Sequence, residues 1–236
     1  MYRSTFSTDI RADSTPLQGT QINAERDLGL DRSKQLQRFT IQWRPFERHE
    51  IAASYFSASR NGFREINTPI VFNGQVYPAR AQVTTDINLK YWDATYTSWI
   101  RRSDRGGLGL NLGVAGLAVD ARLFAKRPGQ TLTITETAST NVPVALIGLQ
   151  GRVAFTPSLF GELNGGVLPH VHIDVYSGRA LTGSARLEYR ILHNLALGVA
   201  YNYFRISGTV SDPQFGGDLA MTIDGAEGYL RLAFGR

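Results

Sequence analysis

The sequence predicts an all-β protein, a closed antiparallel transmembrane β-barrel of about ten strands, with twelve strands as the alternative. Apolar and polar residues alternate with a period of two through most of the chain, which is the pattern of strands with one apolar face. The connections alternate between short and long, and most alternating segments reach the roughly 9–11 residues that a tilted membrane strand needs. Together these observations favour a barrel that crosses a membrane.

The composition narrows the class of protein. The chain has 236 residues and 24 glycines, enough for one large all-β domain, and it contains no cysteine, which excludes disulfides and thiolate metal sites. Its longest apolar run, 142–149, is far shorter than the roughly 20 residues of a membrane-spanning helix. The net charge of +5 comes mainly from arginines scattered along the chain, whereas nucleic-acid binders concentrate basic residues on one face. We therefore expect no nucleic-acid partner.

Period-two alternation defines the expected strands. They are 20–30, 36–45, 49–60, 82–102, 108–125, 142–155, 159–174, 180–192, 195–206 and 219–234. We expect residues 1–18 to form an N-terminal periplasmic or lumenal extension and residues 19–236 to form the barrel, because a barrel with both chain ends in the periplasm has an even number of strands. A twelve-strand count adds 4–12 and 64–72, but Pro69 weakens the second segment. Asn73 and Gly74 instead predict a hairpin tip above the membrane.

The expected strands have one aliphatic face and one polar face. Between 159 and 175 the odd positions include Leu163 and Val167, and the even positions include Glu162 and Asn164. In a membrane barrel the aliphatic face contacts lipid, whereas in a soluble barrel it points inward, so alternation alone fits both. Aromatic residues near the short turns and the C-terminus favour the membrane, since they suit an interfacial girdle. These residues are Trp43, Trp99, Phe155, Tyr189 and Phe234.

The apolar face changes parity in two expected strands. In 108–125 it moves from Leu108 and Leu110 to Leu117 and Leu123, and in 219–234 it changes near Asp224. A β-bulge and the edge of the membrane would each explain such a change.

The chain ends in GYLRLAFGR, with Gly228, Leu230, Leu232 and Phe234 on one face. In this respect it resembles bacterial outer-membrane β-barrels, whose last strand ends in alternating apolar residues with an aromatic at or near the terminus. GTQINAERDLGL and LEYRILHNLALGVAYNYF are similar to segments of uncharacterised small outer-membrane barrel families. The resemblance implies a location in the bacterial outer membrane, and a fold rather than an activity. The strand count is also similar to that of the omptin proteases, but we find neither their pair of acidic residues nor an Asp-x-His at a facing rim.

Charged residues on the polar face are expected to line the lumen. A barrel of about ten strands has a narrow interior that side chains largely fill, so most of these charges should pair with one another. The expected ion-pair network comprises Arg38, Arg44, Arg152, Glu162, Arg186, Glu188, Arg190, Glu227 and Arg231. No catalytic residue, metal site or cofactor is predicted.

His170, His172 and Asp174 form the sharpest chemical feature. A spacing of two on a strand directs all three side chains to one face, where imidazole and carboxylate could bind a metal or act in acid/base chemistry at the extracellular rim. The alternative is a pair of lumenal histidines that hydrogen-bond to neighbouring side chains.

The outer loops supply basic residues for contact with the surroundings. They are Arg60, Arg64, Arg80, Lys126, Arg127 and Arg205, which suit lipopolysaccharide phosphates or open solvent. We expect a non-enzymatic role, either a narrow channel or a structural or ligand-binding scaffold with long extracellular loops. Outer-membrane lipid, a small solute, an extracellular ligand and an envelope protein are the candidate partners. The alternatives are an outer-membrane hydrolase acting on lipid or peptide at the rim, and a soluble lipid-binding barrel.

Overall fold

The computed structural model describes the chain except residues 73, 127–132, 174–175, 212–214 and 235–236. The described residues form fourteen strands and one short helix. The strands are β1 (Tyr2–Ser14), β2 (Ile22–Asn23), β3 (Ser33–Leu36), β4 (Arg38–Phe46), β5 (His49–Glu65), β6 (Ile70–Phe72), β7 (Gln75–Tyr77), β8 (Gln82–Ser103), β9 (Gly106–Lys126), β10 (Thr133–Ala154), β11 (Leu159–Ile173), β12 (Tyr176–Leu192), β13 (Leu195–Ser211) and β14 (Phe215–Leu232); the helix is α1 (Ala24–Asp27).

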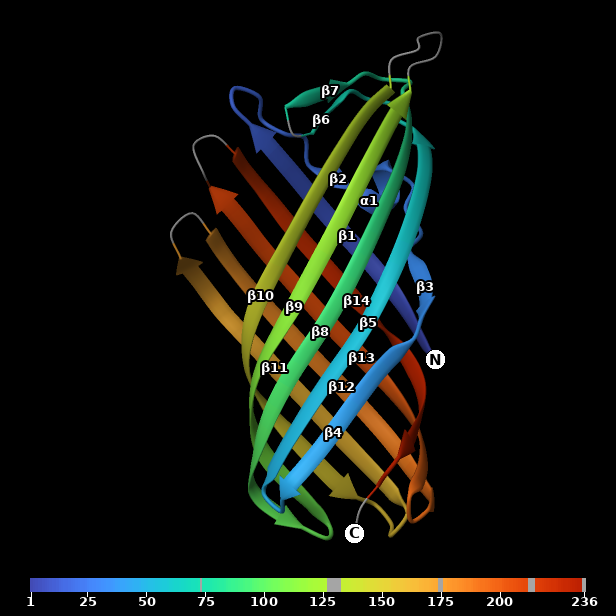
Figure 1. Cartoon of the computed structure of the whole chain (residues 1–236), viewed down its shortest axis with the longest axis vertical. Helices are drawn as coiled ribbons and strands as arrows, with labels where there is room; N and C mark the ends of the chain where they lie inside the picture. The colour runs from blue at the N-terminus through green and yellow to red at the C-terminus, as the bar shows by residue number, and fades with distance from the viewer. Residues whose placement is uncertain (73, 127–132, 174–175, 212–214, 235–236) are drawn as a thin grey trace.

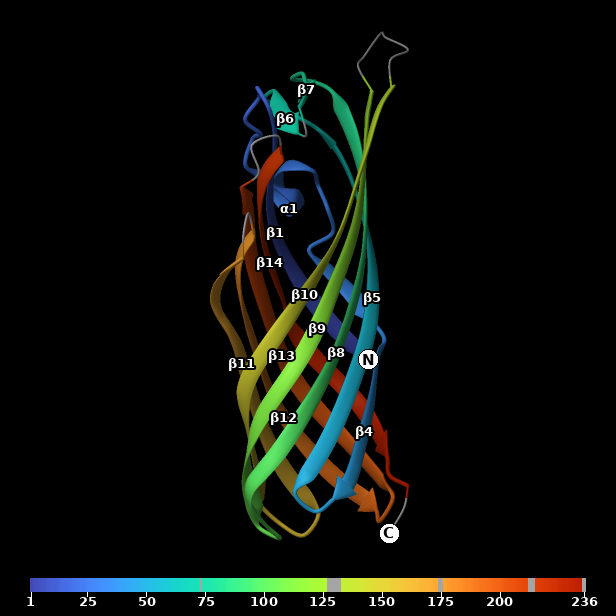
Figure 2. The same cartoon turned by 60° about the vertical axis from the view of Figure 1, so that its left-hand side comes forward.

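Twelve of the strands form one antiparallel sheet, in the order β2-β1-β14-β13-β12-β11-β10-β9-β8-β5-β4, and β3 joins it by pairing with β1. The long strands tilt about a common axis and curve around an interior (Figures 1 and 2). Short turns connect them at one end, which we call the short-turn end. The opposite end, which we call the long-loop end, carries the long connections from β1 to β3 and from β5 to β8, which hold α1 and the β6–β7 pair. None of the helical residues described is part of a helix long and apolar enough to cross a membrane.

The N-terminal segment differs from the prediction. We expected residues 1–18 to be an extension, but β1 pairs with β14 in unbroken register from Tyr2↔Glu227 to Ser14↔Phe215. The alternation in β1 was hard to recognise because two of its inward residues, Ser4 and Thr8, are polar yet buried. Residues 4–12, which only the twelve-strand count included, therefore belong to the sheet.

The expected strand at 20–30 is instead the two-residue β2 followed by α1. The Asn23 side chain accepts a hydrogen bond from the Arg26 backbone N–H (2.9 Å), and Asp27 accepts one from the Asn23 N–H (2.8 Å). Such local side-chain hydrogen bonds cap a helix and compete with strand pairing. Of the segment 64–72, residues 64 and 65 end β5 in the large sheet, whereas residues 70–72 form β6, which pairs with β7 in a separate hairpin at the long-loop end (Figure 1). This hairpin agrees with the turn predicted around Gly74, which has a φ of +74°.

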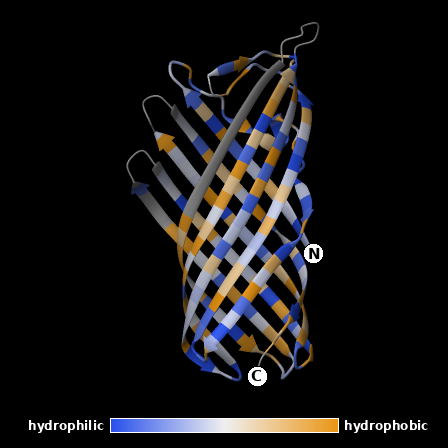
Figure 3. Ribbon diagram, in the orientation of Figure 1, coloured by the Kyte–Doolittle hydropathy of each residue, from blue (hydrophilic) through white to orange (hydrophobic). Residues whose placement is uncertain are grey.

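Toward the short-turn end the sheet is apolar outside and polar inside. Leu187 and Tyr189 are exposed, whereas Glu188 between them is buried. The same outward exposure recurs at Leu110, Leu149, Leu163, Val199 and Leu230, so bands of apolar residues cross successive strands in this half (Figure 3). These residues form an outer surface that we call the apolar belt. The belt contradicts the soluble-barrel alternative, which required the leucines to be inside.

Toward the long-loop end the two faces exchange character. Val83, Ile87 and Leu89 of β8 are buried, while Asn88 and Lys90 between and beside them are exposed. The same exchange explains the parity change in β9, which pairs with β10 in unbroken register throughout. It also explains the change in β14, whose pairing with β1 and β13 shows no shift near Asp224. The edge of the membrane is therefore the correct explanation, since the side-chain alternation is constant and only the outer solvent changes.

Gly198 of β13 lies beneath an aromatic ring inside the sheet. A Cβ atom at this position would approach Tyr229 Cζ to 2.2 Å, and the Tyr229 hydroxyl donates to Glu188 Oε2 at 3.4 Å. We expect Gly198→Ala to lower the free energy of unfolding by about 1–3 kcal/mol through overpacking. Urea unfolding in phospholipid vesicles measures this. Gly151→Ala is the matched control, because no atom lies within 4 Å of its added Cβ, and an equal loss there would refute the steric explanation.

Candidate functional site: the sheet interior

Ion pairs occupy the interior near the short-turn end. Arg186 Nη1 lies 3.5 Å from Glu162 Oε1, and Arg231 Nη2 lies 2.9 Å from Glu188 Oε1. The first pair joins the neighbouring strands β12 and β11, and the second joins β14 and β12, which lie on either side of β13. Even-numbered residues of β11 and β12 point inward here. They stand on the polar face that the sequence indicated, and every carboxylate of the expected network has an arginine within 4.0 Å.

Arg38 and Arg44 of β4 also form ion pairs, and two of their partners, Asp93 and Glu50, were not predicted. Arg38 Nη2 is 3.6 Å from Asp93 Oδ2, and its Nη1 is 4.0 Å from Glu227 Oε2. Arg44 and Gln42 both bind the buried carboxylate of Glu50. Asp93 and Glu50 were missed because identifying an ion-pair partner requires the register between strands, which alternation within one strand does not provide.

Arg152 and Arg190 contact an aromatic ring. Their guanidinium carbons lie 4.8 Å and 4.7 Å from the centroid of Phe160, which is on the strand between them. A guanidinium at this distance from a ring face makes a cation–π interaction. These two predicted network residues are thus held by a ring, a partner that charge matching alone would not suggest.

A small polar cavity lies among these side chains. Its volume is about 120 Å³, and its walls include Arg38, Glu50, Asp93, Gln150 and Asn202. Hydrogen bonds order the walls: Thr97 Oγ1 donates to Gln150 Oε1 at 3.0 Å, and Asn202 Nδ2 donates to Glu227 Oε2 at 2.8 Å. The cavity has the size and polarity for a few water molecules or a very small solute.

A layer of aromatic and aliphatic side chains separates this cavity from the long-loop end. The Tyr91 ring of β8 lies 5.2 Å from the Phe204 ring of β13, and these two strands are not neighbours in the sheet. Phe56 stacks on Tyr91 at 4.9 Å, and Tyr2 of β1 meets Phe56 edge-on at 6.1 Å. Met221, Ile223, Leu89 and Leu117 belong to the same buried cluster. We call this cluster the aromatic layer; it spans the interior from one wall to the other.

Above the aromatic layer, α1 is anchored by a buried ion pair. Arg60 of β5 is 0% exposed, and its Nη1 donates to Glu25 Oε1 at 2.6 Å. The second Glu25 oxygen accepts the Thr8 N–H at 2.8 Å, and Arg60 Nη2 donates to Thr8 Oγ1 at 3.0 Å. The Arg60 guanidinium also lies 4.5 Å from the Phe6 ring centroid. We expected Arg60 in an outer loop; it points inward because β5 continues to Glu65 with its even residues facing the interior.

The predicted interfacial aromatics divide into two groups. Trp43, Phe155, Tyr189 and Phe234 are exposed on the outer surface near the short-turn end. Trp99 is not, since it is only 3% exposed. Outward residues in the membrane part of β8 are even-numbered, as Trp92, Tyr96 and Ile100 show, and the pairing with β9 shifts between Trp99 and Arg101. Nearness to a turn was therefore an insufficient criterion for placing Trp99.

The proposed rim site lies largely outside the described residues. Asp174 and the side chain of His170 are not described, and His172 is exposed on β11. Among the side chains that are described, no group of three or more histidines and acids is arranged to hold a metal ion. Of the predicted loop cations, Arg64, Arg80, Lys126 and Arg205 are exposed, and Arg127 is outside the described residues.

Comparison with known proteins places the fold. No protein-family model matches the chain, and no curated protein does. Among solved structures, the outer membrane protease OmpT from Escherichia coli is similar over 99% of this chain and 95% of that chain, with 11% identity and a TM-score of 0.57. The fold is that of bacterial outer-membrane β-barrels. The likeness and the apolar belt together support the outer-membrane location that the sequence predicted.

Two other outer-membrane structures align more loosely. Ail, the attachment invasion locus protein of Yersinia pestis, is 11% identical over 95% of this chain and 97% of that chain, with a TM-score of 0.29. The translocator domain of the autotransporter NalP from Neisseria meningitidis is 13% identical over 95% of this chain and 88% of that chain, with a TM-score of 0.31.

Proposed function

We propose that the sheet closes into a barrel of ten strands, in which β3 and β4 act as one. β3 pairs with β1 from Tyr2↔Leu36 to Thr5↔Ser33, and β4, which is separated from β3 by one residue, pairs with β5. The ring then runs through β1, β3 with β4, β5, and β8 to β14. A single ring of this kind explains why side chains from β8 and β13 meet in the interior.

Within this barrel we infer a non-conducting scaffold in the outer membrane. The supporting observation is the aromatic layer, whose Tyr91–Phe204 contact crosses the interior. A packed layer of aromatic and aliphatic side chains, in which the Tyr2 and Tyr91 hydroxyls are the polar groups of the residues named, does not replace the hydration shell of an ion, so it blocks an ion path through the interior. The narrow channel is the second candidate, favoured by the polar cavity on one side of this layer.

In the scaffold role, the half of the barrel beyond the apolar belt is the part that contacts a partner. There the strands expose polar residues such as Asn88, Lys90 and Arg122 outward and enclose an apolar core. Lipopolysaccharide is the partner best placed to meet Arg205 and Arg179, which lie on β13 and β12 above the exposed ring of Tyr201. Phosphate groups accept charge-assisted hydrogen bonds from arginine.

Planar bilayer recording tests the scaffold against the channel. Refolded protein should give no conductance steps, with insertion verified separately by heat-dependent gel mobility of the same sample. The double variant Tyr91→Ser with Phe204→Ser removes the two rings whose contact crosses the interior, and should produce steps if it inserts. Steady conductance of the unmodified protein would favour the channel and exclude the scaffold.

A further inference from the structure

Two arginines of the interior have no carboxylate partner. Among the described residues, neither Arg152 nor Arg190 has a carboxylate oxygen within 4.0 Å of its guanidinium group. The described carboxylates that face this part of the interior are already paired with other arginines; they are Glu50, Asp93, Glu162, Glu188 and Glu227. The charges of Arg152 and Arg190 are therefore not neutralised by a direct contact.

The strand register holds these two arginines on either side of Phe160. β11 lies between β10 and β12, and Phe160 is its first inward residue after the β10–β11 turn. Arg152 of β10 pairs with Glu162, the next inward position of β11, and the backbone N–H of Arg190 in β12 donates to the Ser158 carbonyl at 2.7 Å. The two side chains thus reach Phe160 from diagonal positions on its two neighbouring strands, at 4.8 Å and 4.7 Å from its ring centroid.

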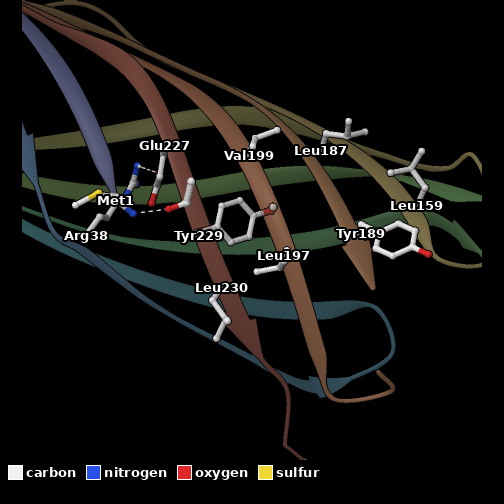
Figure 4. Close-up of a pocket in the computed structure, with 12 residues that line it drawn as sticks. Met1, Arg38, Leu159, Leu187, Tyr189, Leu197, Val199, Glu227, Tyr229 and Leu230 are labelled. Atoms are coloured by element: carbon white, nitrogen blue, oxygen red, sulfur yellow. Dashed lines mark hydrogen bonds and ion pairs between the residues drawn. The ribbon is translucent and has the colours of Figure 1, made fainter. Parts of the chain in front are cut away.

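Phe160 and Arg190 face the interior rather than the lipid. Their chain neighbours Leu159 and Tyr189 are paired with each other and lie close together on the outer surface (Figure 4). Successive side chains of a strand alternate between its two faces, so Phe160 and Arg190 point the other way. Arg190 is exposed, whereas Arg152 and Phe160 are partly buried. The site lies at the short-turn end, which faces the periplasm in outer-membrane barrels.

This arrangement suits a phosphate monoester. A guanidinium over a ring face keeps its N–H donors free for an acceptor at the edge of the ring. Both guanidinium groups lie beside the same ring, so one small anion can contact both. A phosphate monoester has about −1.5 to −2 charges at neutral pH and three strong acceptor oxygens, which match two arginine forks.

We propose that Arg152, Phe160 and Arg190 form a binding site for a phosphate monoester at the periplasmic end of the interior. The two arginines donate hydrogen bonds to the phosphate oxygens, and Phe160 positions their guanidinium groups. This inference goes beyond the scaffold role and does not depend on whether the interior conducts ions, so bilayer recording leaves it untouched.

The phosphate has two possible sources, a soluble periplasmic compound and the headgroup of a membrane lipid. Lipid acyl chains lie against the apolar belt on the outer surface, whereas Phe160 and Arg190 point to the inner face. We therefore expect the soluble source.

Labelling of arginines with phenylglyoxal tests the site residue by residue. The refolded protein is placed in phosphatidylcholine nanodiscs, and mass spectrometry measures the labelling rate of each exposed arginine. Glycerol 3-phosphate should slow the labelling of Arg190 roughly three- to tenfold relative to potassium chloride at the same ionic strength, because charge-assisted hydrogen bonds occupy its donors. Arg105 is the matched control, since it is exposed and its carbonyl accepts the Ala154 N–H of β10 at 2.8 Å. Its labelling should not change.

Two variants separate a defined site from general attraction to a basic surface. Arg152→Gln removes one set of donors, and Phe160→Leu removes the ring but keeps both charges. Each should abolish most of the protection of Arg190, with folding verified by heat-dependent gel mobility. Undiminished protection in both folded variants would overturn the proposal. So would equal protection of Arg105, or equal protection by chloride, and these two comparisons use the unmodified protein.

Phosphatidic acid distinguishes the two sources, because it carries the same phosphate monoester on a lipid. Nanodiscs that contain phosphatidic acid, without any soluble phosphate, should leave the labelling of Arg190 at its value in phosphatidylcholine. Protection by phosphatidic acid alone would retain the site and assign its ligand to a lipid headgroup. If neither glycerol 3-phosphate nor phosphatidic acid protected Arg190, the proposal would be refuted.

Discussion

Glu25→Ala is expected to lower the free energy of unfolding by about 3–5 kcal/mol, the usual result of removing one partner of a buried ion pair. Arg60 would keep its charge in a site where it is 0% exposed, and its acceptors left among the described residues would be Thr8 Oγ1 at 3.0 Å and the Asp31 carbonyl at 3.4 Å. The Thr8 N–H would also lose its acceptor. Urea unfolding in phospholipid vesicles, followed by tryptophan fluorescence, measures the change.

Arg26→Ala is the matched control on the same helix. Arg26 pairs with Asp27 at 2.7 Å, but its side chain is 70% exposed, and exposed ion pairs contribute little. Its unfolding curve should therefore overlay that of the unmodified protein. The double variant Glu25→Leu with Arg60→Met leaves no unpaired charge and should recover most of the lost stability. If Glu25→Ala unfolded like Arg26→Ala, the ion pair would not anchor α1.

Phe56→Ala is expected to lower the free energy of unfolding by about 3–5 kcal/mol, because it leaves a cavity in the aromatic layer. Phe56 is 5% exposed and contacts both Tyr2 and Tyr91. Rings on opposite walls hold the remaining layer, so the surrounding side chains can close the space only in part. Equilibrium unfolding of the refolded variant gives the free energy directly.

Phe39→Ala makes the same chemical change on the adjacent strand. Phe39 is 66% exposed on the apolar belt, and acyl chains fill the space that its ring vacates. The loss in the free energy of unfolding should then be limited to the transfer free energy of the removed ring, about 1–2 kcal/mol, with no added cost for a cavity. Similar losses in the two variants would mean that the interior is loosely packed or hydrated at Phe56, and the non-conducting interior would lose its support.

The features predicted correctly from sequence depend on residues close together in the chain. Period-two alternation is a property of a single strand, so the outward positions of Leu187, Leu163 and Leu230 and the inward position of Glu188 could be predicted from it. The tight turns near Gly106 and Asn194 and the hairpin near Gly74 are equally local.

The errors arose where distant segments or the surrounding solvent decide the outcome. Trp99 faces inward because outward residues of β8 are even-numbered, which its position near a turn does not reveal. Arg60 is buried because β5 continues beyond the membrane and meets Glu25, a residue 35 positions away. Asp93 and Glu50 entered the network through pairing between strands. Within the segment 20–30, residues 24–27 form α1 because capping hydrogen bonds outweigh a weak alternation.

The amino-acid sequence by itself determined the class of fold, the apolar outer surface and the side of each strand that carries charge, since these follow from how neighbouring residues alternate. Only the tertiary structure decided which charges pair and that a layer of aromatic and aliphatic side chains crosses the interior. Those features depend on the register and curvature of the whole sheet, which bring together residues that no local pattern connects.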